Sequence, residues 1–127
     1  MDRQRILVVD DEAAMTRLVR RNLERTGRFE VREENHSKRA AQAALEFRPD
    51  LIFLDLLMPE MDGTQVAEEI RRSDALRDVP IVFISALVPT GAFKTPEPLP
   101  APFVPKPVRA EDLIEAIERY APRPDAV

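Results

Sequence analysis

The chain has 127 residues, of which 44% are apolar and 33% charged, and its formal net charge is −4. This length suits one compact domain, and the acidic balance predicts no direct binding to nucleic acid. The absence of cysteine excludes a disulfide framework, a thiolate metal site and a cysteine nucleophile. No apolar run approaches the ~20 residues that span a bilayer, and no secretory signal opens the chain. We therefore expect a cytoplasmic protein without membrane insertion.

The first third of the chain alternates short apolar runs with amphipathic segments. Residues 6–9 form a continuous run of Ile, Leu and Val, which predicts a strand buried on both faces. The spacing over 12–26 predicts a helix with Leu18 on its inward face, and Gly27 follows as a helix terminator. Residues 29–33 alternate between apolar and polar, which predicts a strand near an edge of the sheet.

The middle of the chain repeats this pattern. Ser37 is predicted to cap a helix that carries Leu45 on its inward face and stops at Pro49. A second buried strand is predicted over residues 51–55. Asp62 and Gly63 are predicted to form a turn.

The remaining elements are expected at residues 64–73 (helix), 81–85 (strand), 103–104 (strand) and 108–120 (helix). Strands that alternate with helices predict an α/β fold, in which a parallel sheet is doubly wound with helices on both faces. We expect one domain over residues 1–121 and a disordered tail over 122–127.

One segment departs from this pattern. Seven of the twelve prolines lie between Leu87 and Pro107, and proline occupies every second position from Pro96 to Pro102. Interior proline removes a helical hydrogen bond and clashes with the preceding turn, so most of a helix is excluded there. Residues 88–107 are therefore an atypical part of the domain.

Carboxylates follow two of the predicted buried strands. Asp10 and Asp11 end the first, and Asp55 ends the run of residues 51–54. In a parallel sheet these ends meet at one edge, where ligands bind. Three clustered negative charges require a cation, and Mg²⁺ is the hard divalent ion usual beside a phosphoryl group. An acidic pair after a strand is by itself more often a loop or a helix cap.

The full set of motifs is more specific than any one of them. Asp10-Asp11, the run from Asp55 to Gly63 that contains Met58-Pro59, Ser85-Ala86 and Lys106-Pro107 stand in order at successive strand ends. In these features the chain resembles the receiver domains of response regulators in two-component signalling. The resemblance implies a flavodoxin-like sheet of five strands in the order 2-1-3-4-5. Because prolines occupy the place of the fourth helix, we expect that helix to be degenerate or missing.

The resemblance implies roles for the clustered acids. Asp55 is expected to be the phosphoacceptor. Mg²⁺ is expected to be held by Asp10, Asp11 and Asp55, together with the backbone carbonyl of Leu57.

It also implies roles for residues of the last strands. Lys106 is expected to pair with the phosphoryl oxygens, and Ser85 to bind the phosphoryl group after transfer. Ser85 and Phe103 are the expected switch residues, and Pro107 is expected to follow a cis peptide bond.

The function that follows is acceptance of a phosphoryl group from a histidine kinase or a histidine phosphotransfer protein. The chain would catalyse only its own phosphorylation and dephosphorylation, and so would not be an enzyme in the ordinary sense. Its change of conformation would switch an output protein, and a homodimer is possible.

Two other functions have some support in the sequence. A receiver-like adaptor could bind a partner through the proline-rich loop without phosphorylation. A hydrolase of the aspartyl-phosphate type requires an acid two residues after the nucleophile, where Leu57 stands. The lack of any G-x-G-x-x-G motif excludes a dinucleotide-binding site. His36, the sole histidine, is expected to be an exposed loop residue.

Overall fold

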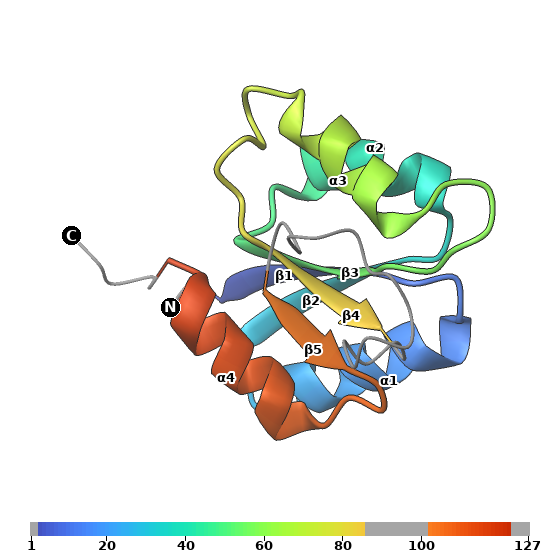
Figure 1. The fold of residues 1–127 in the computed structure, drawn as a ribbon. Helices are drawn as coiled ribbons and strands as arrows, with labels where there is room; N and C mark the ends of the chain where they lie inside the picture. The colour runs from blue at the N-terminus through green and yellow to red at the C-terminus, as the bar shows by residue number, and fades with distance from the viewer. Residues whose placement is uncertain (1–2, 86–101, 123–127) are drawn as a thin grey trace.

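The computed structural model describes residues 3–85 and 102–122 of the chain. Within them, five parallel strands form one sheet in the order β2-β1-β3-β4-β5, which confirms the predicted topology (Figure 1). The strands are β1 Gln4–Val9, β2 Phe29–Glu34, β3 Leu51–Asp55, β4 Ile81–Ser85 and β5 Phe103–Pro105. The helices described are α1 Ala13–Glu24, the short 3₁₀ helix η1 Ser37–Arg39, α2 Ala40–Phe47, α3 Gly63–Arg71 and α4 Ala110–Tyr120.

The helices cover the two faces of the sheet in pairs. Helices α1 and α4 lie on one face, and α2 and α3 lie on the other (Figure 1). Successive residues of β1 point to opposite faces, so Ile6 and Val8 pack beneath α1 and α4 while Leu7 and Val9 pack beneath α2 and α3. This arrangement explains why the central strands are apolar throughout.

The edge strands show the alternation that half-buried strands require. In β2, Phe29 and Val31 are buried, whereas Glu30 between them is exposed. The sequence of β2 therefore correctly predicts that only one face of this strand is buried. Gly27 precedes β2 with a φ of +76°, a left-handed conformation that suits a glycine after a helix.

Two leucines lie outside the core, contrary to the sequence prediction. Leu18 is 51% exposed and Leu45 is 38% exposed. Helix α1 buries Thr16, Val19 and Leu23, whose spacing defines a contact stripe narrower than the predicted apolar face. An apolar residue at the margin of such a stripe remains in contact with water.

The predicted capping role of Ser37 is also wrong. Ser37 lies inside η1, is buried, and its hydroxyl donates to the carbonyl of Pro59 at 3.2 Å. The serine therefore ties the loop after β2 to the loop after β3 and does not cap a helix.

Asp62 and Gly63 do more than turn the chain. The Asp62 side chain accepts a hydrogen bond from the backbone N–H of Gln65 at 3.0 Å, and the Gln65 side chain accepts from the N–H of Asp62 at 3.0 Å. This reciprocal pair is a capping box, which satisfies two helical donors that otherwise have no partner. It fixes the residue at which α3 begins.

The segment expected to lack a regular helix falls mostly on residues 86–101, which lie outside the described residues, as does most of the predicted tail at 122–127. Within residues 3–85 and 102–122, no helix combines the length and apolar character needed to cross a bilayer.

The capping box leads to a prediction of stability. Replacing Asp62 with alanine should lower the free energy of unfolding by about 1 kcal/mol, because the donors at the start of α3 lose their acceptor. Asp62→Asn is the matched control, since asparagine caps equally well and should leave stability within a few tenths of a kcal/mol. Urea denaturation measures both. An equal loss in the two variants would mean that the charge of Asp62, and not its cap, stabilises the helix.

Candidate active site at the carboxyl edge of the sheet

Four strands bring chemically active side chains to one edge of the sheet. Asp10 directly follows β1, Asp55 ends β3, Ser85 ends β4 and Lys106 directly follows β5. The register of the strands fixes how far along the sheet each residue lies, because Asp55 pairs with Ile84 and Ser85 pairs with Pro105. The fold thus gathers residues that are up to 96 positions apart in the sequence.

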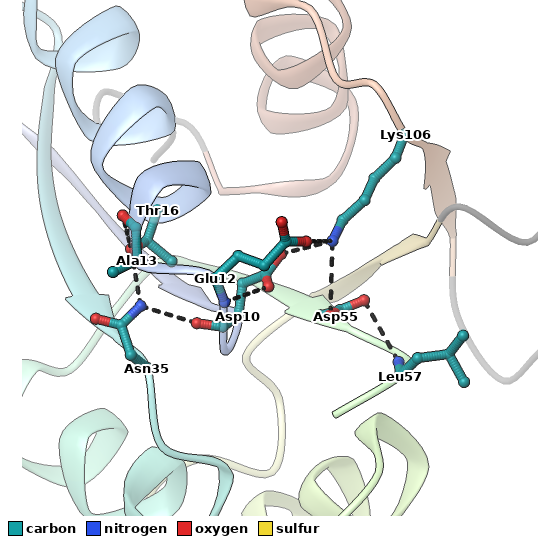
Figure 2. Close-up of polar contacts among 8 residues, drawn as sticks. All are labelled: Asp10, Glu12, Ala13, Thr16, Asn35, Asp55, Leu57 and Lys106. Atoms are coloured by element: carbon teal, nitrogen blue, oxygen red, sulfur yellow. Dashed lines mark hydrogen bonds and ion pairs between the residues drawn. The ribbon is translucent and has the colours of Figure 1, made fainter. Parts of the chain in front are cut away.

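The Lys106 ammonium group lies among three carboxylates (Figure 2). Its Nζ atom is 2.9 Å from Asp10 Oδ2, 3.3 Å from Glu12 Oε1 and 3.6 Å from Asp55 Oδ2. Asp10 is fully buried and the Asp55 side chain nearly so, whereas Glu12 is exposed. Lys106 therefore partly neutralises two buried charges that would otherwise repel each other.

Asp10 is held from both sides by groups that the sequence analysis did not single out. Its Oδ1 accepts a hydrogen bond from the N–H of Glu12 at 3.0 Å. The Asn35 amide donates to the Asp10 carbonyl at 2.8 Å and to the Thr16 hydroxyl at 2.9 Å (Figure 2). The only sequence signal for Asn35 is its position directly after an edge strand, which by itself indicates a loop.

The acids form a compact cluster. One carboxylate oxygen from each of Asp10, Asp11 and Asp55 lies within 4.8 Å of the others. Asp11 is exposed and reaches the cluster from the solvent side. An open hollow of 290 Å³ is lined by Asp11, Glu12, Asp55, Leu57 and Lys106. A small anionic group and a cation could both enter there from solvent.

Burial raises the pKa of Asp55 to about 6, and the charge of Asp10 adds to the effect. The ammonium of Lys106 and the backbone N–H of Leu57, which donates to Asp55 Oδ1 at 3.4 Å, oppose this rise. Burial also works against the charged form of Lys106, but its contacts with Asp10 and Asp55 outweigh burial and keep the pKa of Lys106 above its usual value. At neutral pH both groups are thus mainly charged.

The structure also locates the remaining candidate residues. Ser85 is fully buried, and its carbonyl accepts from the N–H of Lys106 at 2.8 Å. Phe103 is partly buried and packs on the α2–α3 side of the sheet. The Lys106-Pro107 peptide bond is cis. The Leu57 side chain is 56% exposed beside the hollow. His36 is exposed, as expected.

Gly63 allows the backbone of α3 to approach Asp55. A Cβ atom at this position would overlap the carbonyl oxygen of Asp55 and come within 2.8 Å of the Leu56 Cα atom. The N–H of Gly63 also donates to the Leu56 carbonyl at 2.9 Å. The start of α3 is therefore packed directly against the strand end that carries the candidate nucleophile.

Comparison with known proteins identifies the family of the chain. The family model of the response regulator receiver domain matches residues 6–118. The DNA-binding dual master transcriptional regulator RpaA of Synechocystis is 37% identical over 83 residues, which cover 65% of this chain and 34% of that protein. The chain spans about a third of the length of the relatives it matches.

Solved structures share the fold. The chemotaxis protein CheY4 of Vibrio cholerae superposes with a TM-score of 0.82 at 23% identity, covering 94% of this chain and 99% of that one. The receiver domain of the sensor histidine kinase PA1611 of Pseudomonas aeruginosa, which has a magnesium ion coordinated in its active-site cleft, gives a TM-score of 0.78 at 25% identity, covering 94% and 98%.

The chain belongs to the response regulator receiver family, whose members are signalling modules of two-component systems.

The raised pKa of Asp55 predicts how the metal-free protein responds to pH. Since the folded chain binds this proton more tightly than the unfolded chain, Asp55 lowers stability progressively as pH rises from 3.8 to about 6. In a chelating buffer at about pH 8, Asp55→Asn should therefore be about 1–3 kcal/mol more stable than the wild type. At about pH 4 the difference should disappear. Urea denaturation at both values tests this, and a difference independent of pH would contradict the assignment.

Proposed function

We propose that Asp55 accepts a phosphoryl group from a phosphohistidine of a partner protein. The observation that carries the proposal is the nearly buried carboxylate of Asp55, held 3.6 Å from Lys106 and close to two further acids at the mouth of an open hollow. An Asp55 oxygen would attack phosphorus and form the new O–P bond. The N–P bond to the histidine would break, and its electron pair would stay on the imidazole nitrogen, which can then take up a proton.

The environment of Asp55 suits a nucleophile. With a pKa of about 6, Asp55 is mainly ionised at neutral pH, and burial removes much of the water that would otherwise solvate the carboxylate. The N–H of Leu57 holds Oδ1 of Asp55, so that Oδ2 lies toward Lys106. Lys106 is then close enough to balance the charge of an incoming phosphoryl group.

The donor set fits Mg²⁺. The acids Asp10, Asp11 and Asp55 offer hard oxygen ligands within one small space, and the backbone carbonyl of Leu57 is the further ligand that we propose. Within the described residues, the buried Oδ2 of Asp10 accepts no well-directed hydrogen bond and is stabilised mainly by its ion pair with Lys106. Such an oxygen has capacity for a cation. Bound Mg²⁺ would supply positive charge to offset the charge that develops during phosphoryl transfer.

Ser85 and Phe103 are the proposed switch residues. Ser85 ends β4, the strand next to the one that Asp55 ends, and its backbone carbonyl accepts a hydrogen bond from the N–H of Lys106. A hydrogen bond from the serine hydroxyl to a phosphoryl oxygen would draw this strand end toward Asp55. Phe103 of β5 pairs in register with Phe83 of β4, so a shift of β4 would act directly on Phe103.

The partners that we propose are a histidine kinase or a histidine phosphotransfer protein as donor, and an output protein as receiver of the signal. Because the match covers only 34% and 27% of the first two relatives, their activities do not define the output here. The adaptor alternative depends on the proline-rich loop, most of which lies outside the described residues.

Labelling tests the phosphoacceptor. Incubation with acetyl phosphate and Mg²⁺ should modify wild-type protein on Asp55, and Asp55→Asn should reduce incorporation at least tenfold because an amide is a poor nucleophile. Asp50→Asn is the matched control, since Asp50 borders the opposite end of the same strand and should label normally. Peptide mapping locates the phosphate. Undiminished labelling of Asp55→Asn would reject the proposal.

Thermal unfolding tests the metal ligands. Mg²⁺ at a hundred times its dissociation constant should stabilise the wild type by about 3 kcal/mol, because it binds only the folded site. Asp11→Asn should lose most of this gain. Asp78→Asn removes an equal charge at an exposed position of the α3–β4 loop and should retain the gain. An equal Mg²⁺ response in all three proteins would show that the acids do not hold the ion.

A further inference from the structure

The Glu12 carboxylate holds Lys106 at the rim of the hollow beside Asp55. Its Oε1 atom lies 3.3 Å from Lys106 Nζ, and the Glu12 side chain is 67% exposed whereas that of Lys106 is 16% exposed. Nζ lies 2.9 Å from Asp10 Oδ2, but its distance of 3.6 Å from Asp55 Oδ2 exceeds that of a normal hydrogen bond. The lysine is therefore bound more closely to Asp10 and Glu12 than to the candidate nucleophile.

The backbone of Glu12 positions this carboxylate. Its N–H donates to Asp10 Oδ1 at 3.0 Å, and its carbonyl accepts from the N–H groups of Met15 at 3.0 Å and Thr16 at 3.2 Å. The Glu12 side chain forms no cap for α1, and in the described part of the chain its only ion pair or hydrogen bond is the contact with Lys106. A change of this side chain would therefore act on Lys106, while the start of α1 keeps its backbone hydrogen bonds.

Glu12 is not one of the clustered acids that fit a metal ion. Among the described residues, the carboxylate oxygens that lie within 4.8 Å of one another belong to Asp10, Asp11 and Asp55. The Glu12 side chain lines the same hollow but points to Lys106 (Figure 2). An effect of Glu12 on the lysine can thus be separated from an effect on Mg²⁺ binding.

A phosphoryl group on Asp55 would compete with Glu12 for the lysine. Such a group carries about two negative charges on its oxygens and would attract Nζ more strongly than a single carboxylate does. In Figure 2 the contacts of Nζ with Asp10 and Glu12 leave toward one side, and the contact with Asp55 leaves in another direction. The contact with Glu12 is longer than that with Asp10 and more exposed, so it is the one that breaks when the ammonium moves toward Asp55.

We propose that Glu12 is a positioning residue that restrains phosphorylation of Asp55 by holding Lys106 away from the incoming phosphoryl group. This inference rests on the proposed function of Asp55. In the transfer step an Asp55 oxygen forms a bond to phosphorus, the bond from phosphorus to the donor breaks, and the donor keeps the electron pair of that bond. Lys106 gives up no proton and only exchanges Glu12 for a phosphoryl oxygen. The ion pair stabilises the unphosphorylated state alone, so its loss adds to the barrier.

Labelling kinetics test this role on the full chain. With acetyl phosphate and saturating Mg²⁺, Glu12→Gln should label Asp55 about twofold to fivefold faster than the wild type, which corresponds to about 0.4–1 kcal/mol for an ion pair with one exposed partner. Glu68→Gln removes the same charge at an exposed position of α3 and should label at the wild-type rate. Glu12→Gln should also retain the rise in melting temperature that Mg²⁺ produces.

A double-mutant cycle separates the contact from the general effect of a negative charge. Lys106→Met removes the group through which Glu12 is proposed to act, so Glu12→Gln should not accelerate labelling in that background. Equal acceleration with and without Lys106 would overturn the proposal, and so would a Glu12→Gln protein that labels no faster than the wild type. If the wild type itself were not labelled, the phosphoacceptor role of Asp55 would fail and this inference with it, so the two failures are distinguishable.

The nitrogen resonance of the Lys106 ammonium group gives a second readout that does not depend on rates. The chain has only the lysines Lys38, Lys94 and Lys106, so this signal can be assigned by single substitutions. Glu12→Gln should shift it in the unphosphorylated protein. With beryllofluoride and Mg²⁺, which imitate the phosphoryl group, the wild type and the variant should give the same signal, because the contact with Glu12 is then absent from both. A difference that persists in this complex would contradict the proposal.

Discussion

The interaction on which the rest of the site depends is the contact of one ammonium group with two buried carboxylates. Parallel strands end at a common edge, so Asp10 and Asp55 are forced together by the fold itself. Their repulsion would destabilise that edge unless a positive charge lay between them. Lys106 reaches them from beyond β5, and it thereby connects the last strand to the first and third.

The same constraint explains the surrounding loops. Asn35 fixes the backbone of Asp10, and Gly63 lets α3 pack on the carbonyl side of Asp55. Neither residue carries charge, but each limits how far an acid can move away from its neighbour. A site built in this way buries Asp55 and holds it close to Asp10 at a cost in stability, and burial first and the charge of Asp10 second raise the pKa of Asp55. A cation bound between these carboxylates would reduce this repulsion.

The sequence predicts the sheet well because a strand that is buried on both faces consists of consecutive apolar residues. Residues 6–9 and 51–54 are apolar without interruption, and both are central strands. It predicts the helix margins less well, as Leu18 and Leu45 show, because periodicity does not define how wide a contact each helix makes. Ser37 illustrates a further limit: its hydroxyl bonds to Pro59, a partner 22 residues away that no local pattern indicates.

For the site, the motif order led to the acids and the lysine, whereas the residues that support them required three-dimensional information. Glu12 is an example that joins two parts of the molecule. Its N–H bonds to the Asp10 carboxylate and its side chain to Lys106, and it is also the residue from which α1 begins. A phosphoryl group on Asp55 would compete for Lys106 and release Glu12 from it. The start of α1 would then lose one restraint, which connects the charge at the site with the helix that begins after Glu12.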